Sequence, residues 1–374
     1  MIPFLRPVIP NSQNLMNDRF AKILDSGIFV FGENTSEFET AIRDFCEVDY
    51  AVSLSSCSHG LILLMSQVDA DVVILPAFTF SATGQGVFWN SHLKFAFADV
   101  DESGLLSPET LEPVIRRYPG AAVLAVHMYG NPCDVKGLQE VTERYGGTLY
   151  FDSAHGLGAE VSGKSLGSSG RAEVFSLGVT KCLPCGEGGV LTTNDRSLAE
   201  KISRARIHGK VNSTLPYESS LDTDINGLNA RGQEFNAALG CHLLPYLPDF
   251  IRRRNEIANS YRDAFGDRVI SQVLSSNTCS YKDFAIRAGT CRSEKLTVAR
   301  RLLEHGIQTK EYYYPTIPKL QSVEILSNRN VSLTTSFPVA EKLAETALAL
   351  PIYPDLSEKE VSFIIDAVLE SLSQ

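Results

Sequence analysis

Short apolar runs alternate with amphipathic segments through the first half of the chain. The runs have the length of β-strands and cover residues 51–54, 71–75, 94–98, 121–126, 148–151, 174–175 and 190–191. Helical spacing of apolar residues recurs between them, over residues 35–46, about 81–89, from 107, and 134–145. Asn34 is the expected N-cap of the first helix. Strands that alternate with helices predict a parallel sheet covered on both faces, and therefore an α/β fold.

The pattern changes in the second half of the chain, which is mostly helical. Apolar residues at helical spacing predict helices over 197–207, 232–244, 252–264, 293–305 and 357–372, and a strand over 283–287. A polar loop over 208–231 separates the first two helices, and loops of this length are often functional. We expect two domains, a large one over residues 1–247 and a smaller α/β domain over residues 248–374.

Composition places the chain among ordinary globular proteins. Of its 374 residues, 44% are hydrophobic and 21% charged, and no apolar run approaches the roughly 20 residues that span a bilayer. The first residues do not resemble a signal peptide, so we expect a cytoplasmic protein without a membrane partner. The net charge of −10 with no basic block argues against a nucleic-acid partner.

Eight cysteines are scattered along the chain, which suits reduced thiols in the cytosol. Only Cys182 and Cys185 have the C-x-x-C spacing, and no second pair lies nearby. We interpret them as two small side chains in a tight loop; a functional dithiol is the less favoured alternative. No metal site is expected.

Several chemically versatile residues fall where the predicted strands end. Asp152 follows the strand at 148–151 and precedes His155, while the run of small residues over 55–60 lies between a strand and a helix. Phe80 and Lys181 also lie just past strands. Ligands of parallel sheets bind beyond the carboxyl ends of the strands, so these groups can converge in one crevice. Taken alone, Lys181 reads as a solvated loop lysine.

Together, these groups match what pyridoxal phosphate requires. Its aldehyde forms a Schiff base with a lysine, and burial near glycines favours the neutral amine of Lys181. Its phosphate can bind to backbone N–H groups at a helix N-terminus, here after the small residues at 55–58. A carboxylate such as Asp152 stabilises its protonated ring nitrogen, and an aromatic ring such as Phe80 can cover its plane.

At this point the sequence resembles the DegT/DnrJ/StrS family of sugar aminotransferases, over nearly the whole chain. Residues 151–159 (FDSAHGLGA) resemble the family's "(E/F)DxA(Q/H)xxGA" segment, and residues 175–189 (FSLGVTKCLPCGEGG) resemble its "FSFxxTKxLxxGEGG" segment. Residues 227–231 (GLNAR) and 236–240 (NAALG) resemble "GYNYRxxxxxAALG". The resemblance implies a fold-type I aminotransferase with a mostly parallel seven-stranded sheet and a smaller C-terminal α/β domain.

The resemblance also implies roles for individual residues. Lys181 would form the Schiff base and shuttle the proton, Asp152 would pair with the ring nitrogen, and His155 would hydrogen-bond near the phenolic oxygen. The remaining cofactor residues would be Phe80 against the ring, with Cys57, Ser58, His59 and Ser176 at the phosphate. Asn229 would reach the phosphate in the partner subunit of a homodimer with shared active sites. Substrate-side candidates are His208, Lys210, Arg231, Tyr312, Tyr313 and Tyr314.

Two sequence details bear on the reaction. The phosphate turn of the family usually contains Gly-Thr, whereas here those positions are Cys57 and Ser58, which keeps the backbone donors and a hydroxyl. In the family that the sequence resembles, GEGG, here at residues 186–189, goes with amination at C4 of a keto-sugar or with amination of an inosose, whereas GDGG goes with C3. We therefore expect amination of a nucleotide-linked 4-keto-6-deoxyhexose, with L-glutamate as donor. The alternatives are a cyclitol (scyllo-inosose) aminotransferase and a non-catalytic regulatory protein that binds pyridoxal phosphate.

Overall fold

The computed structural model describes residues 1–210, 222–275 and 278–373. Its main element is a seven-stranded sheet with the order β1-β9-β8-β5-β4-β2-β3. The strands are β1 (Tyr50–Leu54), β2 (Val72–Pro76), β3 (Lys94–Ala98), β4 (Ala122–Val126), β5 (Thr148–Asp152), β8 (Glu173–Ser176) and β9 (Gly189–Thr193). Only β9 runs antiparallel to its neighbours, β1 and β8. The predicted seven-stranded, mostly parallel sheet is therefore confirmed.

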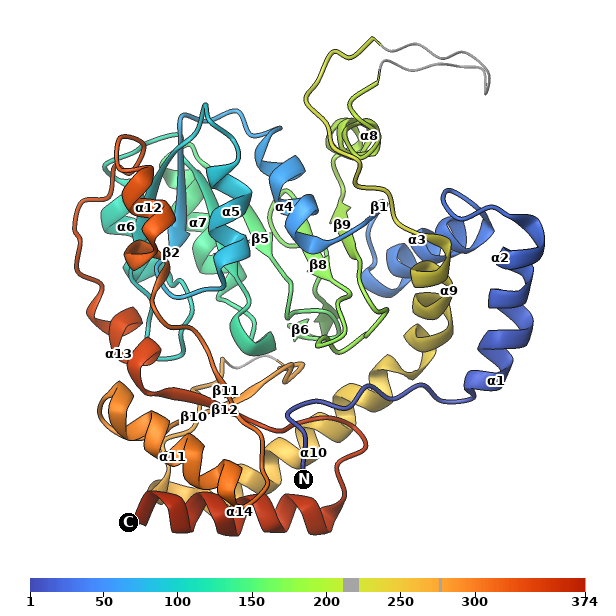
Figure 1. Cartoon of the computed structure of the whole chain (residues 1–374). Helices are drawn as coiled ribbons and strands as arrows, with labels where there is room; N and C mark the ends of the chain where they lie inside the picture. The colour runs from blue at the N-terminus through green and yellow to red at the C-terminus, as the bar shows by residue number, and fades with distance from the viewer. Residues whose placement is uncertain (211–221, 276–277, 374) are drawn as a thin grey trace.

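Helices cover both faces of this sheet, as the alternating pattern predicts. Figure 1 shows α4 and α5 packed side by side in front of it. The helices of this part are α3 (Glu33–Cys46), α4 (Cys57–Met65), α5 (Ser81–Phe88), α6 (Pro108–Ile115), α7 (Val135–Arg144), α8 (Arg196–Ala205) and α9 (Glu234–Leu243). Strand β4 is buried at every position, because a central parallel strand is covered on both faces. A short hairpin, β6 (Glu160–Val161) and β7 (Lys164–Ser165), lies beside the sheet.

A second, smaller sheet has the order β10-β12-β11. Its strands are β10 (Phe284–Arg287), β11 (Lys310–Glu311) and β12 (Ala347–Leu350), and the helices near it are α10 (Leu247–Phe265), α11 (Arg292–Glu304), α13 (Pro338–Thr346) and α14 (Glu358–Ser373). The short helix α12 (Gln321–Ile325) instead packs Val323 into the core of the large sheet. A separate hydrophobic cluster lies between the smaller sheet and α10, α11 and α14. The division at 247/248 falls where α10 begins and stays a prediction.

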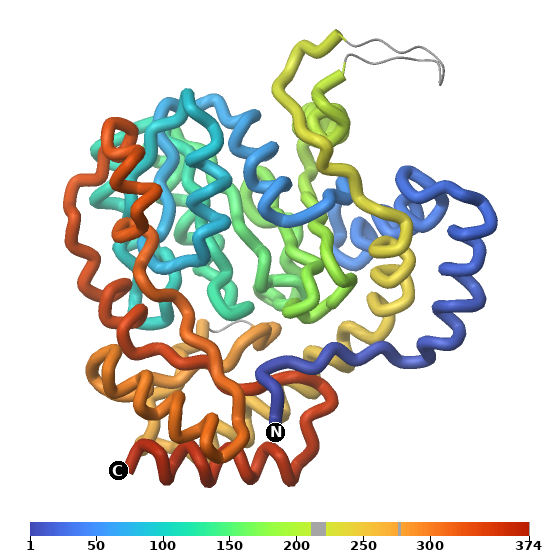
Figure 2. Tube along the Cα trace, viewed as in Figure 1, coloured from blue at the N-terminus to red at the C-terminus, as the bar shows by residue number. Residues whose placement is uncertain are grey.

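The N-terminal arm extends away from both sheets, as the trace in Figure 2 shows. It contains α1 (Ser12–Asn14), a π-helical stretch η1 (Leu15–Phe20) and α2 (Ala21–Ser26), which the sequence pattern did not predict. The chain start returns to the small sheet, where Ile2 is buried in the second cluster and bridges Ile307. None of the helices in the described part of the chain is long and apolar enough to cross a membrane.

The expected cap of α3 is wrong. The helix begins at Glu33 with Gly32 as N-cap, and no side chain of its own first turn caps it. The buried carboxylate of Glu234, from α9, instead accepts hydrogen bonds from the backbone N–H groups of Gly32, Asn34 and Thr35, each at 2.9 Å. Sequence spacing could not reveal this cap, because the acceptor lies 200 residues away along the chain.

We expect Glu234→Gln to lower the stability of the protein by about 2 kcal/mol at neutral pH, since hydrogen bonds to a charged acceptor contribute more than those to a neutral one. Burial opposes ionisation of Glu234, but the hydrogen bonds from Thr35 and Asn34 outweigh it and lower its pKa. Because the pKa of Glu234 is lower in the folded protein, its ionised carboxylate stabilises the fold at pH values above the usual pKa of a glutamate. This stabilisation is lost as the pH falls through the folded-state pKa.

Thermal unfolding of the wild type and of Glu234→Gln, followed by circular dichroism from neutral to acidic pH, tests this prediction. The exposed Glu140→Gln is the matched control, because its side chain is 59% accessible. The unfolding temperatures of the wild type and of Glu234→Gln should approach each other as the pH falls. A difference between them that stays constant on acidification would contradict the proposed role of the Glu234 carboxylate.

Candidate active site

One cavity of about 320 Å³ opens where the carboxyl end of β5 meets the small sheet. Its wall is built mainly from the turn between β1 and α4, the segment between β2 and α5, the ends of β4 and β5, and the loop between β8 and β9. The small-sheet side adds Lys282, before β10, and residues around β11. The predicted site residues on this wall are Cys57, Ser58, Phe80, Asp152, His155, Ser176, Lys181, Tyr312 and Tyr313. The volume is at the lower end of the range for small-molecule sites.

Lys181 lies in the loop between β8 and β9, and its backbone N–H donates to the carbonyl of Gly178 at 2.9 Å. Glycines shape this loop: Gly186 and Gly188 have φ angles of +81° and +147°, which residues with a side chain rarely adopt. Burial, followed by the nearby charge of Lys282, lowers the pKa of the Lys181 amine to about 8. The amine is therefore far easier to deprotonate than that of a solvated lysine.

We expect the rate at which the protein captures pyridoxal phosphate to rise with pH and to level off above about 8, because only the neutral amine attacks an aldehyde. Below that pH the amine is increasingly protonated. The measurement is the growth of the visible absorption band after mixing apoprotein with pyridoxal phosphate across this range. Lys282→Met should move the midpoint upward, since it removes a neighbouring positive charge. A midpoint near the ordinary lysine value in the wild type would contradict the assignment.

Asp152 ends β5 and is buried, with 4% of its surface exposed. One carboxylate oxygen accepts a hydrogen bond from the Thr83 hydroxyl at 2.7 Å and the other from the backbone N–H of Ala154 at 3.1 Å. Burial raises the pKa of this carboxyl, while the two hydrogen bonds and Lys181 oppose the increase. A cation bound beside the carboxylate would oppose it further and favour the ionised form.

The turn from β1 into α4 forms one corner of the cavity, with Ser56, Cys57 and Ser58 on the wall. Gly189 leaves room for this turn, since a Cβ there would lie 2.6 Å from the backbone nitrogen of Cys57. The free backbone N–H groups at the start of α4 can bind an anion. Ser176, the last residue of β8, adds a hydroxyl to the same cavity.

His155 and Phe80 occupy the remaining predicted cofactor positions. The ring of His155 accepts a hydrogen bond from the Tyr129 backbone N–H through Nδ1, and its Nε2 lies 3.5 Å from the Tyr313 hydroxyl. Burial, with Lys181 and Lys282 adding to the effect, lowers the pKa of His155 well below its ordinary value, so the ring is neutral. Phe80 is 53% exposed although it is aromatic, and it lines the cavity.

Comparisons with known proteins agree with this geometry. The model of the DegT/DnrJ/EryC1/StrS aminotransferase family matches residues 10–369. The chain belongs to this family. It is 31% identical to the erythromycin biosynthesis sensory transduction protein EryC1 of Saccharopolyspora erythraea over 92% of each chain. It is 29% identical to the dTDP-3-amino-3,6-dideoxy-alpha-D-galactopyranose transaminase of Aneurinibacillus thermoaerophilus, over 98% of this chain and 99% of that one.

The solved structure of DesI in the presence of its TDP-sugar product matches with a TM-score of 0.84 at 28% identity, covering 98% of this chain and 91% of that one. The predicted family, the fold-type I architecture and the class of pyridoxal-phosphate-dependent aminotransferases are thereby confirmed. The residues present fit this cofactor: the cavity joins a partly buried amine of lowered pKa, a buried carboxylate and the backbone N–H groups at the start of α4.

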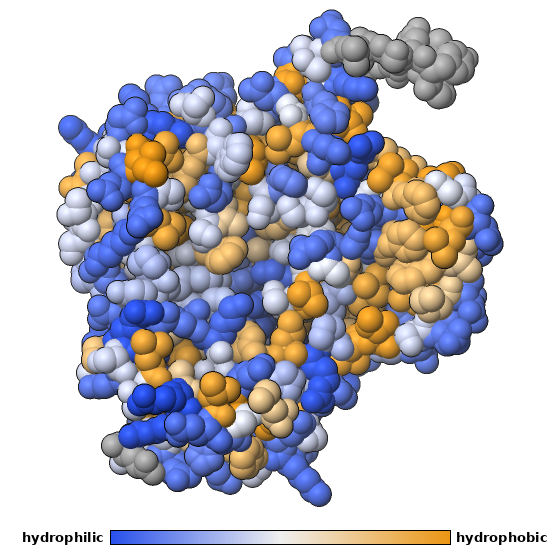
Figure 3. All heavy atoms as spheres, in the orientation of Figure 1, coloured by the Kyte–Doolittle hydropathy of each residue, from blue (hydrophilic) through white to orange (hydrophobic). Residues whose placement is uncertain are grey.

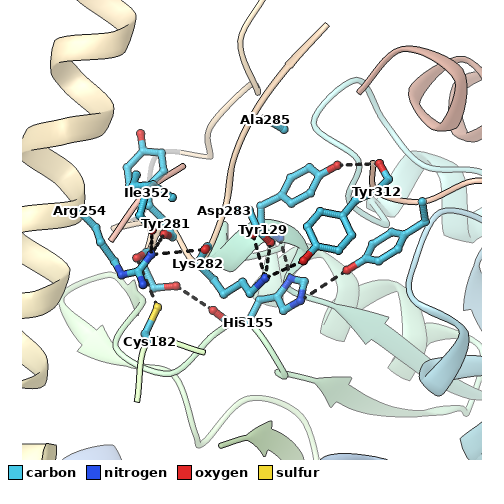
Figure 4. A network of polar contacts seen from close by, with 12 residues as sticks. Tyr129, His155, Cys182, Arg254, Tyr281, Lys282, Asp283, Ala285, Tyr312 and Ile352 are labelled. Atoms are coloured by element: carbon cyan, nitrogen blue, oxygen red, sulfur yellow. Dashed lines mark hydrogen bonds and ion pairs between the residues drawn. The ribbon is translucent and has the colours of Figure 1, made fainter. Parts of the chain in front are cut away.

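The sequence analysis missed a buried charged group on the small-sheet side of the cavity. The Lys282 ammonium pairs with both carboxylate oxygens of Asp283, at 2.8 and 2.9 Å, and donates to the Tyr312 hydroxyl at 3.2 Å. Figure 4 shows this group beside His155 and Tyr129. Thr83, the hydrogen-bond donor to Asp152, was also missed. Charged residues next to a short apolar strand, and a threonine in a helix, give no sequence signal of a site.

Six predicted residues do not line the cavity: His59, His208, Lys210, Asn229, Arg231 and Tyr314. The backbone N–H of His59 donates instead to the Ser56 hydroxyl, which caps α4. The ring of Tyr314 lies under the Arg292 guanidinium, 3.9 Å from its carbon. Part of the polar loop at 208–231 lies outside the described residues.

Asn229 and Arg231 are bound to each other, with the guanidinium donating to the Asn229 side-chain oxygen at 3.0 Å. Asn229 is exposed and does not line the cavity of its own chain, and its role toward a partner subunit stays a prediction. The thiols of Cys182 and Cys185 are free and buried, and they donate to the carbonyls of Ser280 and Leu183 respectively. The C-x-x-C pair forms no disulfide in this structure.

Proposed function

We propose that this protein transfers an amino group to a nucleotide-linked keto-sugar, with L-glutamate as donor, at C4 of a 4-keto-6-deoxyhexose. The observation that carries the proposal is that Lys181 and Asp152 share one cavity with the turn at Ser56, Cys57 and Ser58. Pyridoxal phosphate, when bound, supplies an aldehyde that condenses with amines and a ring that withdraws electrons from the reacting bond. The chain's own residues then decide where protons move and which substrates fit.

Each group of the cavity has a task in this proposal. The neutral amine of Lys181 would hold the cofactor through its aldehyde and, when free, would carry the proton that has to be moved during the reaction. The Asp152 carboxylate, positioned by Thr83, would stabilise a protonated ring nitrogen. The start of α4 and Ser176 would hold the phosphate, and Phe80 would pack against the ring.

Support for C4 comes from the segment GEGG at residues 186–189. Its only side chain beyond glycine, that of Glu187, lines the cavity, which supports the expectation that the choice of Glu or Asp at this position affects which carbon is aminated. The name of the relative from Aneurinibacillus thermoaerophilus refers to a 3-amino sugar, so membership of the family does not decide which carbon of the sugar is aminated. Glu187→Asp is the variant that tests this choice between C3 and C4.

A homodimer with shared active sites also belongs to the proposal. Large apolar side chains that are 44–64% exposed gather in the N-terminal arm and the segment after it: Met16, Leu24, Ile28, Phe29 and Phe31. Figure 3 shows apolar surface collected over this region. A second copy that covered it would remove this area from water. Asn229 would then reach the neighbouring cavity. A monomer by light scattering at micromolar concentration would refute this part.

The deciding experiment loads the protein with pyridoxal phosphate, converts it with L-glutamate and then offers scyllo-inosose and a panel of nucleotide-linked keto-sugars, each scored by return of the visible band. Return with a 4-keto-6-deoxyhexose, and an amine at C4 of the product by NMR, supports the proposal. Return with scyllo-inosose alone favours the cyclitol enzyme. A visible band that no amino donor bleaches favours a regulatory protein. The relative EryC1 is named a sensory transduction protein, which agrees with that alternative. The expected cytoplasmic location stays a prediction.

A further inference from the structure

The edge strand β11 contributes two residues whose side chains leave the small sheet on opposite faces, as the alternation of a strand requires. Glu311 faces α11, where it pairs with Arg292 at 3.2 Å and with Lys295 at 2.8 Å. Lys310 faces the other way and lines the cavity. Glu311, the acidic residue nearest to Lys310 along the chain, is therefore already paired with two cations on the opposite face of the sheet.

The other lysine on this side of the cavity is neutralised as well. Lys282 is paired with the buried carboxylate of Asp283 and has 2% of its side chain exposed. Lys310, by contrast, is exposed and forms no ion pair within residues 1–210, 222–275 and 278–373. Its ammonium lies 5.3 Å from the centre of the Tyr312 ring, which is itself fixed by its hydrogen bond from Lys282.

We propose that Lys310 binds an anionic group of a substrate at the small-sheet side of the cavity. This inference rests on the proposed function, because it presumes that the cavity takes substrates beside the cofactor. The start of α4, which comes from a different part of the chain, already offers backbone N–H groups for the cofactor phosphate. The Lys310 ammonium lies against the Tyr312 ring at the cavity wall and has no carboxylate partner among the described residues. It therefore provides a second position that can bind an anion.

Two substrate groups share the required chemistry. One is the side-chain carboxylate of a dicarboxylic amino donor, and the other is the diphosphate of a nucleotide-linked sugar. The cavity of about 320 Å³ has room for the cofactor and a small substrate group, whereas a nucleotide would extend past its exposed rim, where Lys310 lies. Both groups would meet the ammonium from the solvent side, so the experiment has to separate them.

The test compares wild-type protein, Lys310→Met and Lys310→Arg, each loaded with pyridoxal phosphate. Lys164→Met is the matched control, because Lys164 is also an exposed lysine at the first position of a two-residue strand but lies outside the cavity. The donor arm measures the concentration of L-glutamate, and of its neutral analogue L-glutamine, that half-bleaches the visible band. The nucleotide arm measures the dissociation constants of dTDP and UDP by calorimetry.

We expect Lys310→Met to weaken one anion at least about tenfold, since a charge-assisted hydrogen bond is lost. Lys310→Arg should restore binding to within about threefold, and Lys164→Met should change nothing. Weakening for L-glutamate but not L-glutamine identifies the donor carboxylate, whereas weakening for dTDP or UDP identifies the diphosphate. Unchanged values in both arms overturn the inference. Because each variant must first show the visible band, loss of the band in all proteins would refute the proposed function instead.

Discussion

Lys181→Ala is expected to abolish covalent capture of pyridoxal phosphate and all transamination, because the variant has no amine at the position that the cavity presents to the cofactor. The turn at Ser56–Ser58 is untouched, so the variant should still bind the cofactor, but without the visible band of the lysine-bound form. Activity should fall to the background of the assay. Folding should be unaffected, since the change removes a partly buried amine whose ionised form burial disfavours.

The structure makes this test more specific than a loss of activity. Lys282 is a second amine on the same wall, but its nitrogen is already bonded to both carboxylate oxygens of Asp283 and to the Tyr312 hydroxyl, so it is not free to approach an aldehyde. Borohydride reduction of the loaded wild type, followed by peptide mass spectrometry, should therefore place the label on Lys181 alone. Lys282→Met should be labelled like the wild type. A label on Lys282 in either protein would contradict the assignment of the nucleophile.

Asp152→Asn should produce the second-largest effect, lowering kcat by about a hundredfold or more, because a neutral amide cannot stabilise a protonated ring nitrogen. The amide oxygen can still accept the hydrogen bond from the Ala154 N–H, and the amide NH2 can donate to the Thr83 hydroxyl in place of the bond that Thr83 donates in the wild type, so the geometry of β5 should be retained. Covalent capture by Lys181 should persist, which separates this variant from Lys181→Ala. Steady-state rates and the visible band, measured on the same preparation, provide the two readouts.

Thr83→Val is the matched comparison for that result. It removes one hydrogen bond to the Asp152 carboxylate but leaves the charge, so kcat should fall by only about tenfold. Wild-type kcat in Asp152→Asn would contradict the proposed role of the carboxylate. An equal loss in both variants would mean that position, and not charge, is what Asp152 contributes.

Much of the large sheet could be predicted from the sequence, because its strands are buried and its helices each have one apolar face. The group at the end of β5 could also be predicted, since carboxyl ends of parallel strands meet at one edge. The helices of the N-terminal arm could not. Residues such as Met16 and Leu24 are exposed there, and only Leu15 and Ile23 of η1 and α2 are buried, so the arm lacks a one-sided apolar pattern.

The polar residues of the site show where sequence reasoning stops. Serines at 55, 56 and 58 are equally suited to capping a helix or to binding phosphate, and only the structure shows that Ser56 caps α4 and takes the N–H of His59. The pairing of Lys282 with Asp283 was missed because adjacent opposite charges usually lie on a solvated surface. Here both side chains are buried against Tyr312.

The strand contact between Ile2 and Ile307 has a consequence for how the protein matures during translation. The backbone N–H of Ile2 donates to the carbonyl of Gly306 at 2.7 Å, and its side chain packs in the second cluster with Ile364 and Val368. Ile2 is therefore synthesised long before α14, and its cluster cannot close until α14 has been made. The cavity wall at Lys310 belongs to the same late part of the chain, so a nascent chain acquires the Lys181 loop well before it can enclose a substrate.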